Sequence, residues 1–204
     1  MRIMLYFFTA LVYMVFTQNI VFTGGYGISE SIRTAARPKQ ILLFSVSITY
    51  FTTVTSLICR LFSKIDLFKS ATATVNVILF TVVLAVLYFL TIAALKPVLK
   101  RAGWEEKAKE KLFDQAGVSA FNTVVLSVPF IGQKAAFTIS ESIGAGIGAG
   151  CAFALATLLI NEGMKKIEEN DRIPDAFKGI PALFLYIAVL AMAFTGVTGK
   201  SLFL

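Results

Sequence analysis

The sequence predicts an all-α integral membrane protein with six transmembrane helices. Of its 204 residues, 57% are apolar and only 15% are charged, a composition too apolar for a soluble domain of this size. Six apolar stretches account for most of the chain and leave no room for a separate soluble domain. Two of them, near the start and just past the middle, combine an asparagine with helix-breaking residues. We therefore expect the first and fourth helices of the bundle to be broken.

The apolar stretches define the expected spans in chain order. All but the fourth approach the ~20 residues that a helix needs to cross the hydrocarbon core. They cover residues 3–22, 40–59, 74–95, 116–132, 135–160 and 179–197. The first is interpreted as a retained helix, because polar residues and glycines follow it where a signal peptide would show a small-residue cleavage site. Glycines at alternate positions from 144 to 150 predict close packing of the fifth helix against a neighbour.

The connection after the third span is the most highly charged part of the chain. Pro97 follows Lys96 there and is expected to end the third helix. Beyond it, Trp104, Ala108 and Leu112 fall at helical spacing among charged residues. This pattern predicts a short amphipathic helix, either lying on the cytoplasmic membrane surface or, as the simpler interpretation, forming a solvated linker.

The distribution of cations predicts the orientation. The net charge is +7, and thirteen Lys and Arg residues fall in connections one, three and five, against six on the opposite side. Because cytoplasmic connections carry the excess of Lys and Arg in membrane proteins, both termini are expected outside. The positive charge therefore gives no reason to expect a nucleic-acid partner.

Each interrupted stretch places an amide side chain beside helix breakers. Residues 18–27 contain Asn19 and three glycines, and residues 121–132 contain Asn122 and Pro129. Lipid offers no water to a loosened backbone, so such a break is tolerated where it is buried in protein or lines a cavity. A matched pair in corresponding halves indicates a site at the bilayer midplane. Asn19 and Asn122 are candidate site residues, although hydrogen bonds to the freed backbone would explain them equally well.

The other polar residues argue against a self-contained enzyme. The chain has no histidine, the commonest acid, base and metal-ligating side chain. Cys59 and Cys151 stand in or beside different spans without ligand spacing, so we expect buried, inert thiols and no metal site. Glu30 and Glu141 are candidates for an ion or proton path. The simpler interpretation is that each carboxylate faces water near a cation.

Four segments of the chain resemble the A subunit of the Rnf electron-transport complex and the related D and E subunits of the Na⁺-translocating NADH:quinone reductase (Nqr). They are residues 18–21, 122–125, 173–182 and 191–196. The resemblance extends over essentially the whole chain. It implies two inverted three-helix repeats, about residues 1–95 and 116–204, joined by a cytoplasmic linker at residues 96–115.

The resemblance also implies a partner and a cofactor. In the family, a homologous membrane subunit of opposite orientation faces this one, and the two share an intramembrane [2Fe–2S] cluster through cysteines of their half-helix regions. The matching positions here are Ser29 and Thr123, which directly follows Asn122. Serine and threonine are poor iron ligands compared with thiolate. We therefore expect no cofactor to be bound at the positions that match the family's cluster region. In this chain these positions are Asn19, Ser29, Asn122 and Thr123.

These observations support two function hypotheses from different classes. The leading one is a multi-pass subunit in a bacterial or archaeal cell membrane. It would support electron transfer coupled to Na⁺ or H⁺ translocation in an Rnf/Nqr-type complex, without being catalytic alone. The alternative is a small solute or ion transporter that reuses the same inverted-repeat fold. A purely structural subunit is a third possibility.

Overall fold

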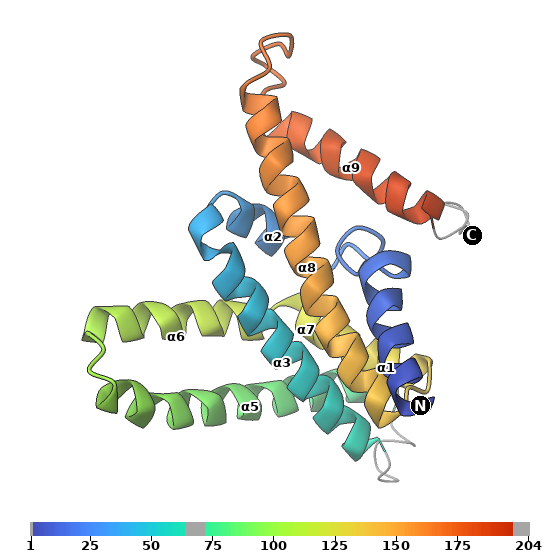
Figure 1. Cartoon of the computed structure of the whole chain (residues 1–204), viewed down its shortest axis with the longest axis vertical. Helices are drawn as coiled ribbons and strands as arrows, with labels where there is room; N and C mark the ends of the chain where they lie inside the picture. Colours follow the sequence, from blue (N-terminus) through green and yellow to red (C-terminus); the bar gives the residue numbers. More distant parts are fainter. Residues whose placement is uncertain (1, 64–71, 198–204) are drawn as a thin grey trace.

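The computed structural model describes residues 2–63 and 72–197, which form helices and connecting segments without a β-strand among them (Figure 1). The predicted all-α class is confirmed for this part of the chain. The first half contains α1 (Arg2–Val12), the π-helical turn η1 (Tyr13–Thr17), α2 (Ile28–Ala35), the 3₁₀ turn η2 (Pro38–Gln40), α3 (Ile41–Phe62) and α5 (Ala73–Arg101). The second half contains α6 (Glu106–Ala120), α7 (Thr123–Lys134), α8 (Ile139–Glu168) and α9 (Ile180–Val197).

Several of these helices are suited to a membrane. Within the described residues, four helical stretches are long and apolar enough to cross a bilayer, and two shorter apolar helices stand at the ends of the described chain. The long ones are Pro38–Phe62, Thr74–Arg101, Glu106–Lys134 and Ile139–Glu168; the short ones are Arg2–Thr17 and Ile180–Gly196. The chain is therefore a multi-pass membrane protein. Its first and last apolar helices are shorter than the sequence pattern predicts.

The centre of the molecule is α8, with α3 on one side and α1 on the other (Figure 1). Its glycines allow neighbouring backbones to come close. A Cβ atom added to Gly146 would lie 2.8 Å from the backbone nitrogen of Thr53, and one added to Gly148 would lie 2.6 Å from the carbonyl oxygen of Leu11. The Thr52 hydroxyl uses this proximity to donate a hydrogen bond of 2.9 Å to the Gly146 carbonyl. The predicted packing role of the glycines is confirmed.

Of two predictions for the charged connection, the one for Pro97 is wrong and the one for a helix holds with different bounds. Pro97 does not end the third helix, because α5 continues to Arg101. The helix is terminated instead by Gly103, two residues after Arg101, where φ is +71°. Trp104 N donates a hydrogen bond to the Leu99 carbonyl, which is the pattern of a Schellman-type glycine C-cap. The expected helix after this turn is present but longer than predicted, because α6 runs from Glu106 to Ala120, across the expected start of the fourth span.

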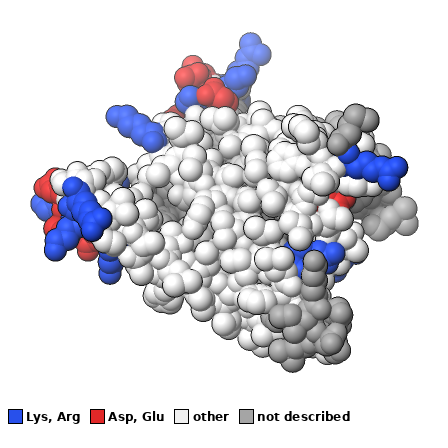
Figure 2. All heavy atoms as spheres, turned by 60° about the horizontal axis from the view of Figure 1, so that its bottom comes forward, with Lys and Arg blue, Asp and Glu red and all other residues white. Residues whose placement is uncertain are grey.

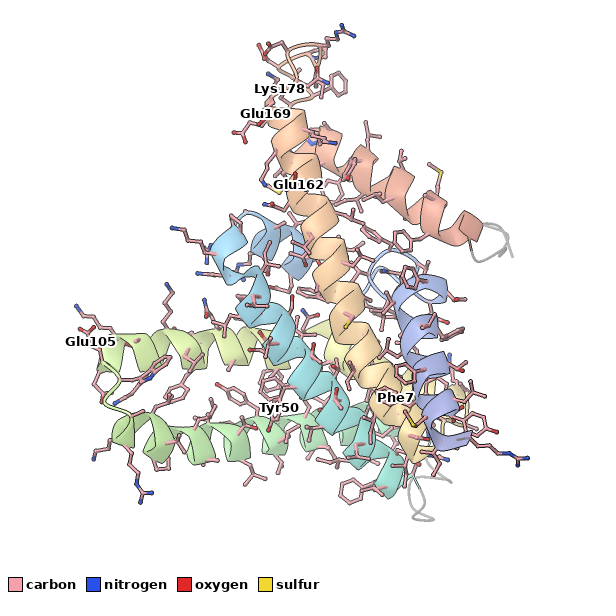
Figure 3. All side chains as sticks on the ribbon, in the orientation of Figure 1. Phe7, Tyr50, Glu105, Glu162, Glu169 and Lys178 are labelled. Atoms are coloured by element: carbon pink, nitrogen blue, oxygen red, sulfur yellow. The ribbon has the colours of Figure 1, made fainter. Side chains whose placement is uncertain are left out.

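The charged connections between the helices lie at the edges of the molecule. The α5–α6 hairpin stands out to the left in Figure 1, with Glu105 at its tip, while Glu169 and Lys178 lie at the far end of α8 (Figure 3). Charged side chains gather at such edges and leave a broad uncharged surface between them (Figure 2). Lys64, Lys69 and Lys200, which contribute to the charge count, lie outside the described residues.

Gly146→Ala is expected to lower the free energy of unfolding by about 1–3 kcal/mol, because the added methyl group meets the backbone of α3. The measurement is the melting temperature of the detergent-purified chain, followed by loss of the monodisperse gel-filtration peak. Gly196→Ala is the matched control, since a Cβ atom there meets nothing within 4 Å. Equal melting temperatures for the two variants would contradict the close α3–α8 contact.

Candidate functional site

The first helix break lies between η1 and α2, and its asparagine is fully buried. Asn19 is 0% exposed. Its Nδ2 donates to the Val15 carbonyl at 3.0 Å, and its Oδ1 accepts from the backbone nitrogens of Val21 and Phe22 at 3.3 and 3.1 Å. These are backbone groups that the broken helix leaves without regular partners. The amide of Asn19 therefore replaces helical hydrogen bonds on both sides of the break.

The second break is a short interruption between α6 and α7. Asn122 is the N-cap of α7, and its Oδ1 accepts from Val124 N at 2.9 Å, as N-cap asparagines commonly do. Its Nδ2 is buried and has no hydrogen-bond partner among the described residues. Pro129, which the sequence pattern treats as a second breaker, lies inside α7 without ending it. The break is therefore confined to Phe121 and Asn122.

The two breaks touch each other. Gly27 N donates a hydrogen bond of 2.8 Å to Thr123 Oγ1, joining residues 96 positions apart. Gly27 has φ +73°, and a Cβ atom on it would lie 2.9 Å from Asn122 Oδ1. Gly27 is the N-cap of α2, as Asn122 is of α7. The N-termini of two half-helices, each with a positive partial charge, therefore lie side by side.

The predicted site residues fall into two groups. Asn122 and Thr123 lie at the contact between the breaks, whereas the hydrogen bonds of Asn19 stay within its own segment. Ser29 lies in the first turn of α2 and is exposed. Sequence reasoning missed Gly27 as a site residue. The glycine-rich run that precedes α2 was the available signal for it, because such runs provide the positive φ required here.

A cavity of about 390 Å³ adjoins this contact. Thr123 and Tyr26 line it together with Ser127 and Lys134, and apolar side chains of α5 and α7 complete its walls. Ser127 donates its hydroxyl to the Val124 carbonyl at 2.9 Å. The polar groups of this cavity are thus hydroxyls and one ammonium, on an otherwise apolar surface.

The donor atoms at the break do not fit an iron–sulfur cluster. Ser29, Thr123 and Asn122 offer oxygen and amide groups, whereas such clusters are held chiefly by cysteine thiolates. The two cysteines stand elsewhere, Cys59 buried in α3 and Cys151 exposed on α8. Among the described residues there is also no group of three or more His, Cys, Asp or Glu side chains that could hold a metal ion.

The two candidate carboxylates of an ion path have local partners. Glu141 completes a capping box at the start of α8, where its Oε2 accepts from the backbone nitrogen and the hydroxyl of Thr138, both at 2.7 Å. Glu30 Oε2 lies 4.0 Å from Arg33 in α2, but this oxygen is buried and has no hydrogen-bond partner among the described residues. A capping role therefore accounts for Glu141, whereas the buried oxygen of Glu30 departs from the simpler interpretation of a carboxylate that faces water.

Thr123→Val is expected to lower the free energy of unfolding by about 1–3 kcal/mol, because the buried N–H group of Gly27 loses its acceptor. Thr123→Ser keeps the hydroxyl and should retain most of the stability. Thr81→Val is the control, since the Thr81 hydroxyl bonds only the Val77 carbonyl of its own exposed turn. Thermal unfolding in detergent measures all three variants. A Thr123→Val variant as stable as Thr81→Val would show that the contact between the breaks does not depend on this bond.

Comparison with known proteins shows which membrane subunits this chain is similar to. No protein-family model matches it. It is 24% identical to the A subunit of the Na⁺-translocating ferredoxin:NAD⁺ oxidoreductase complex of Acetobacterium woodii over 92% of this chain and 94% of the relative. It is 32% identical to the A subunit of the proton-translocating ferredoxin:NAD⁺ oxidoreductase complex of Clostridium ljungdahlii, over 39% of this chain and 41% of that protein. The E subunit of the Na⁺-translocating NADH-quinone reductase of Alcanivorax borkumensis is 27% identical over 46% of this chain and 50% of its own. Over nearly its whole length, the chain is therefore similar to the A subunit of an Rnf-type complex, and over about half of its length to the E subunit of an Nqr complex.

Proposed function

We propose that this chain is a membrane subunit of an Rnf/Nqr-type complex and supports transmembrane electron transfer coupled to Na⁺ or H⁺ translocation. The observation that carries the proposal is the match to the A subunit of a Na⁺-translocating ferredoxin:NAD⁺ oxidoreductase complex over 92% of the chain. The apolar helices agree with a place in the membrane part of such a complex. Its partners are the other subunits of that complex and the lipid bilayer.

The order of elements supports an inverted-repeat architecture. A broken helix is followed by two further helices in each half, as α1, α2, α3 and α5 and again as α6, α7, α8 and α9. The N-caps of the two second half-helices, Gly27 and Asn122, are in contact. Two repeats inserted with opposite topology would bring their broken helices together in this way.

The same architecture supports an orientation and a partner. The three odd-numbered connections, with their excess of cations, face the cytoplasm, and both termini lie outside. The partner that faces this chain is a homologous membrane subunit of opposite orientation. Tyr26, Ser29 and Thr123, which are exposed beside the helix breaks, are the surface that this chain would present to it.

This chain contributes structure to the electron path rather than iron ligands. The oxygen donors at the break support this assignment, and so does the hydrogen bond that already engages Thr123. Within the complex, the chain would hold the half-helix N-termini in place beside its partner. Any thiolate ligands of a cluster at this depth would then belong to other subunits.

A tagged copy of the chain, purified from its native membrane, is expected to bring with it a homologous membrane subunit and flavin- and iron–sulfur-containing subunits. Mass spectrometry of the purified sample identifies them, and iron content with low-temperature electron paramagnetic resonance characterises the clusters. A chain that is recovered alone, and that moves a solute or ion in proteoliposomes without an electron donor, would support the transporter alternative instead.

Cys59→Ser and Cys151→Ser are expected to leave the iron content and the resonance signals of the purified complex unchanged, because neither thiol lies at the break. A [2Fe–2S] signal that disappears in either variant would show that this chain does ligate a cluster. The melting temperature of each variant separates loss of a ligand from loss of the fold.

Reporter fusions test the orientation. A fusion after Gly103, in the α5–α6 turn, is expected to report a cytoplasmic position, and a fusion after Val197 is expected to report an external one. The charge asymmetry between the two sides is the physical reason. The opposite pattern at both sites would reverse the assignment.

A further inference from the structure

A second polar cavity lies away from the helix breaks, between α2, η2, α3 and α6. Its volume is about 260 Å³. Arg33 and Arg37 reach it from the first connection, and Lys111 reaches it from α6. Thr34, Gln40 and Gln115 add polar side chains, while Phe44 and Val118 supply apolar ones. Neither the breaks nor the proposed electron path uses these residues.

The cations of this cavity are poorly neutralised. Asp114 is the only carboxylate among the side chains that line it. No ion pair engages Arg37 or Lys111 within the described residues, and the closest carboxylate of Arg33 is Glu30 at 4.0 Å, with 63% of the arginine side chain exposed. Three cations facing one carboxylate leave an excess of positive charge, so the cavity favours an anion.

The position of the cavity indicates that its ligand also has an apolar part. In the orientation proposed above, on which this inference rests, the cavity lies among the cytoplasmic connections, on the side where anionic phospholipids are enriched. Val118 lines it and is itself 38% exposed, and Phe121, three residues further along at the C-cap of α6, is 48% exposed. An anion in the cavity would therefore have an apolar, lipid-facing surface beside it. A free phosphate ion has no group that could use that surface, whereas a phospholipid has its acyl chains.

We propose that this cavity binds the phosphate-bearing headgroup of an anionic phospholipid of the cytoplasmic leaflet. Arg33, Arg37 and Lys111 bind the phosphate, and the acyl chains lie along the exposed apolar side chains at the end of α6. Bidentate recognition of phosphate is a property of the guanidinium group, and the two arginines lie on the same segment. The lipid joins α2 and α6, which belong to different halves of the chain.

The larger cavity on the other side of α2, about 600 Å³, is a weaker candidate for the same ligand. It also includes Arg33, but its second cation, Lys178, lies 3.9 Å from Asp171, and Glu168 lines its wall. Its charges are more nearly balanced, so it gives less reason to attract an anion.

The test uses the full-length chain in detergent, with native mass spectrometry and thermal stabilisation as readouts. Phosphatidylglycerol is expected to bind and to raise the melting temperature, whereas phosphatidylcholine and inorganic phosphate should do so much less. Arg37→Gln and Lys111→Gln should each weaken phosphatidylglycerol binding about fivefold, since one Lys or Arg near an anionic membrane surface contributes roughly that factor. Arg172→Gln, an exposed cation of the α8–α9 connection, is the matched control and should bind like the unaltered chain.

Asp114→Asn keeps the proposal falsifiable if the other variants fold poorly, because removing the one carboxylate should strengthen phosphatidylglycerol binding. Equal binding of the two lipids, or equal effects of Lys111→Gln and Arg172→Gln, would overturn the proposal. Stabilisation by inorganic phosphate alone would assign the cavity to a free anion. A site that loses its lipid when the whole complex is assembled would assign this surface to a partner protein.

Discussion

The constraint on which this structure depends is that backbone groups freed by a helix break need hydrogen-bond partners inside the protein, because lipid provides none. The chain meets it in two ways. Asn19 and Asn122 replace helical partners within their own segments, and Gly27 N finds its acceptor on Thr123, across the molecule. The last hydrogen bond joins the two halves of the chain at their helix breaks.

The glycine face of α8 makes this arrangement possible. Because Gly146 and Gly148 carry no side chain, α3 and α1 approach α8 at backbone distance. Hydrocarbon tails give little driving force for burying apolar side chains, so close packing of this kind has to hold membrane helices together. The α5–α6 hairpin lacks such a face and stands out from the bundle (Figure 1), and many apolar side chains of α5 are exposed. That surface is where lipid or other subunits would lie.

The chemistry of the break and the similarity to known proteins lead to different expectations. The relatives named above are subunits of ion-translocating oxidoreductases, whereas the groups at the contact here are hydroxyl, amide and backbone N–H. A hydroxyl that accepts a hydrogen bond from the opposite half-helix stabilises the same contact without metal. The architecture of the region and its ligand chemistry can therefore vary independently, since the first depends on the backbone and the second on two side chains.

Composition and local pattern determined much of this protein. Its membrane class, its helical content, the two breaks and the packing role of the alternate glycines are readable from the chain, because apolar length and helix-breaking residues act locally. The tertiary structure decided the rest. Pro97 lies inside α5, and the glycine cap at Gly103 rather than this proline ends the helix. Pro129 likewise lies inside α7, while the break falls at Phe121 and Asn122. Above all, the contact of Gly27 with Asn122 and Thr123 joins residues far apart in sequence, and only the packing of both halves around α8 brings them together.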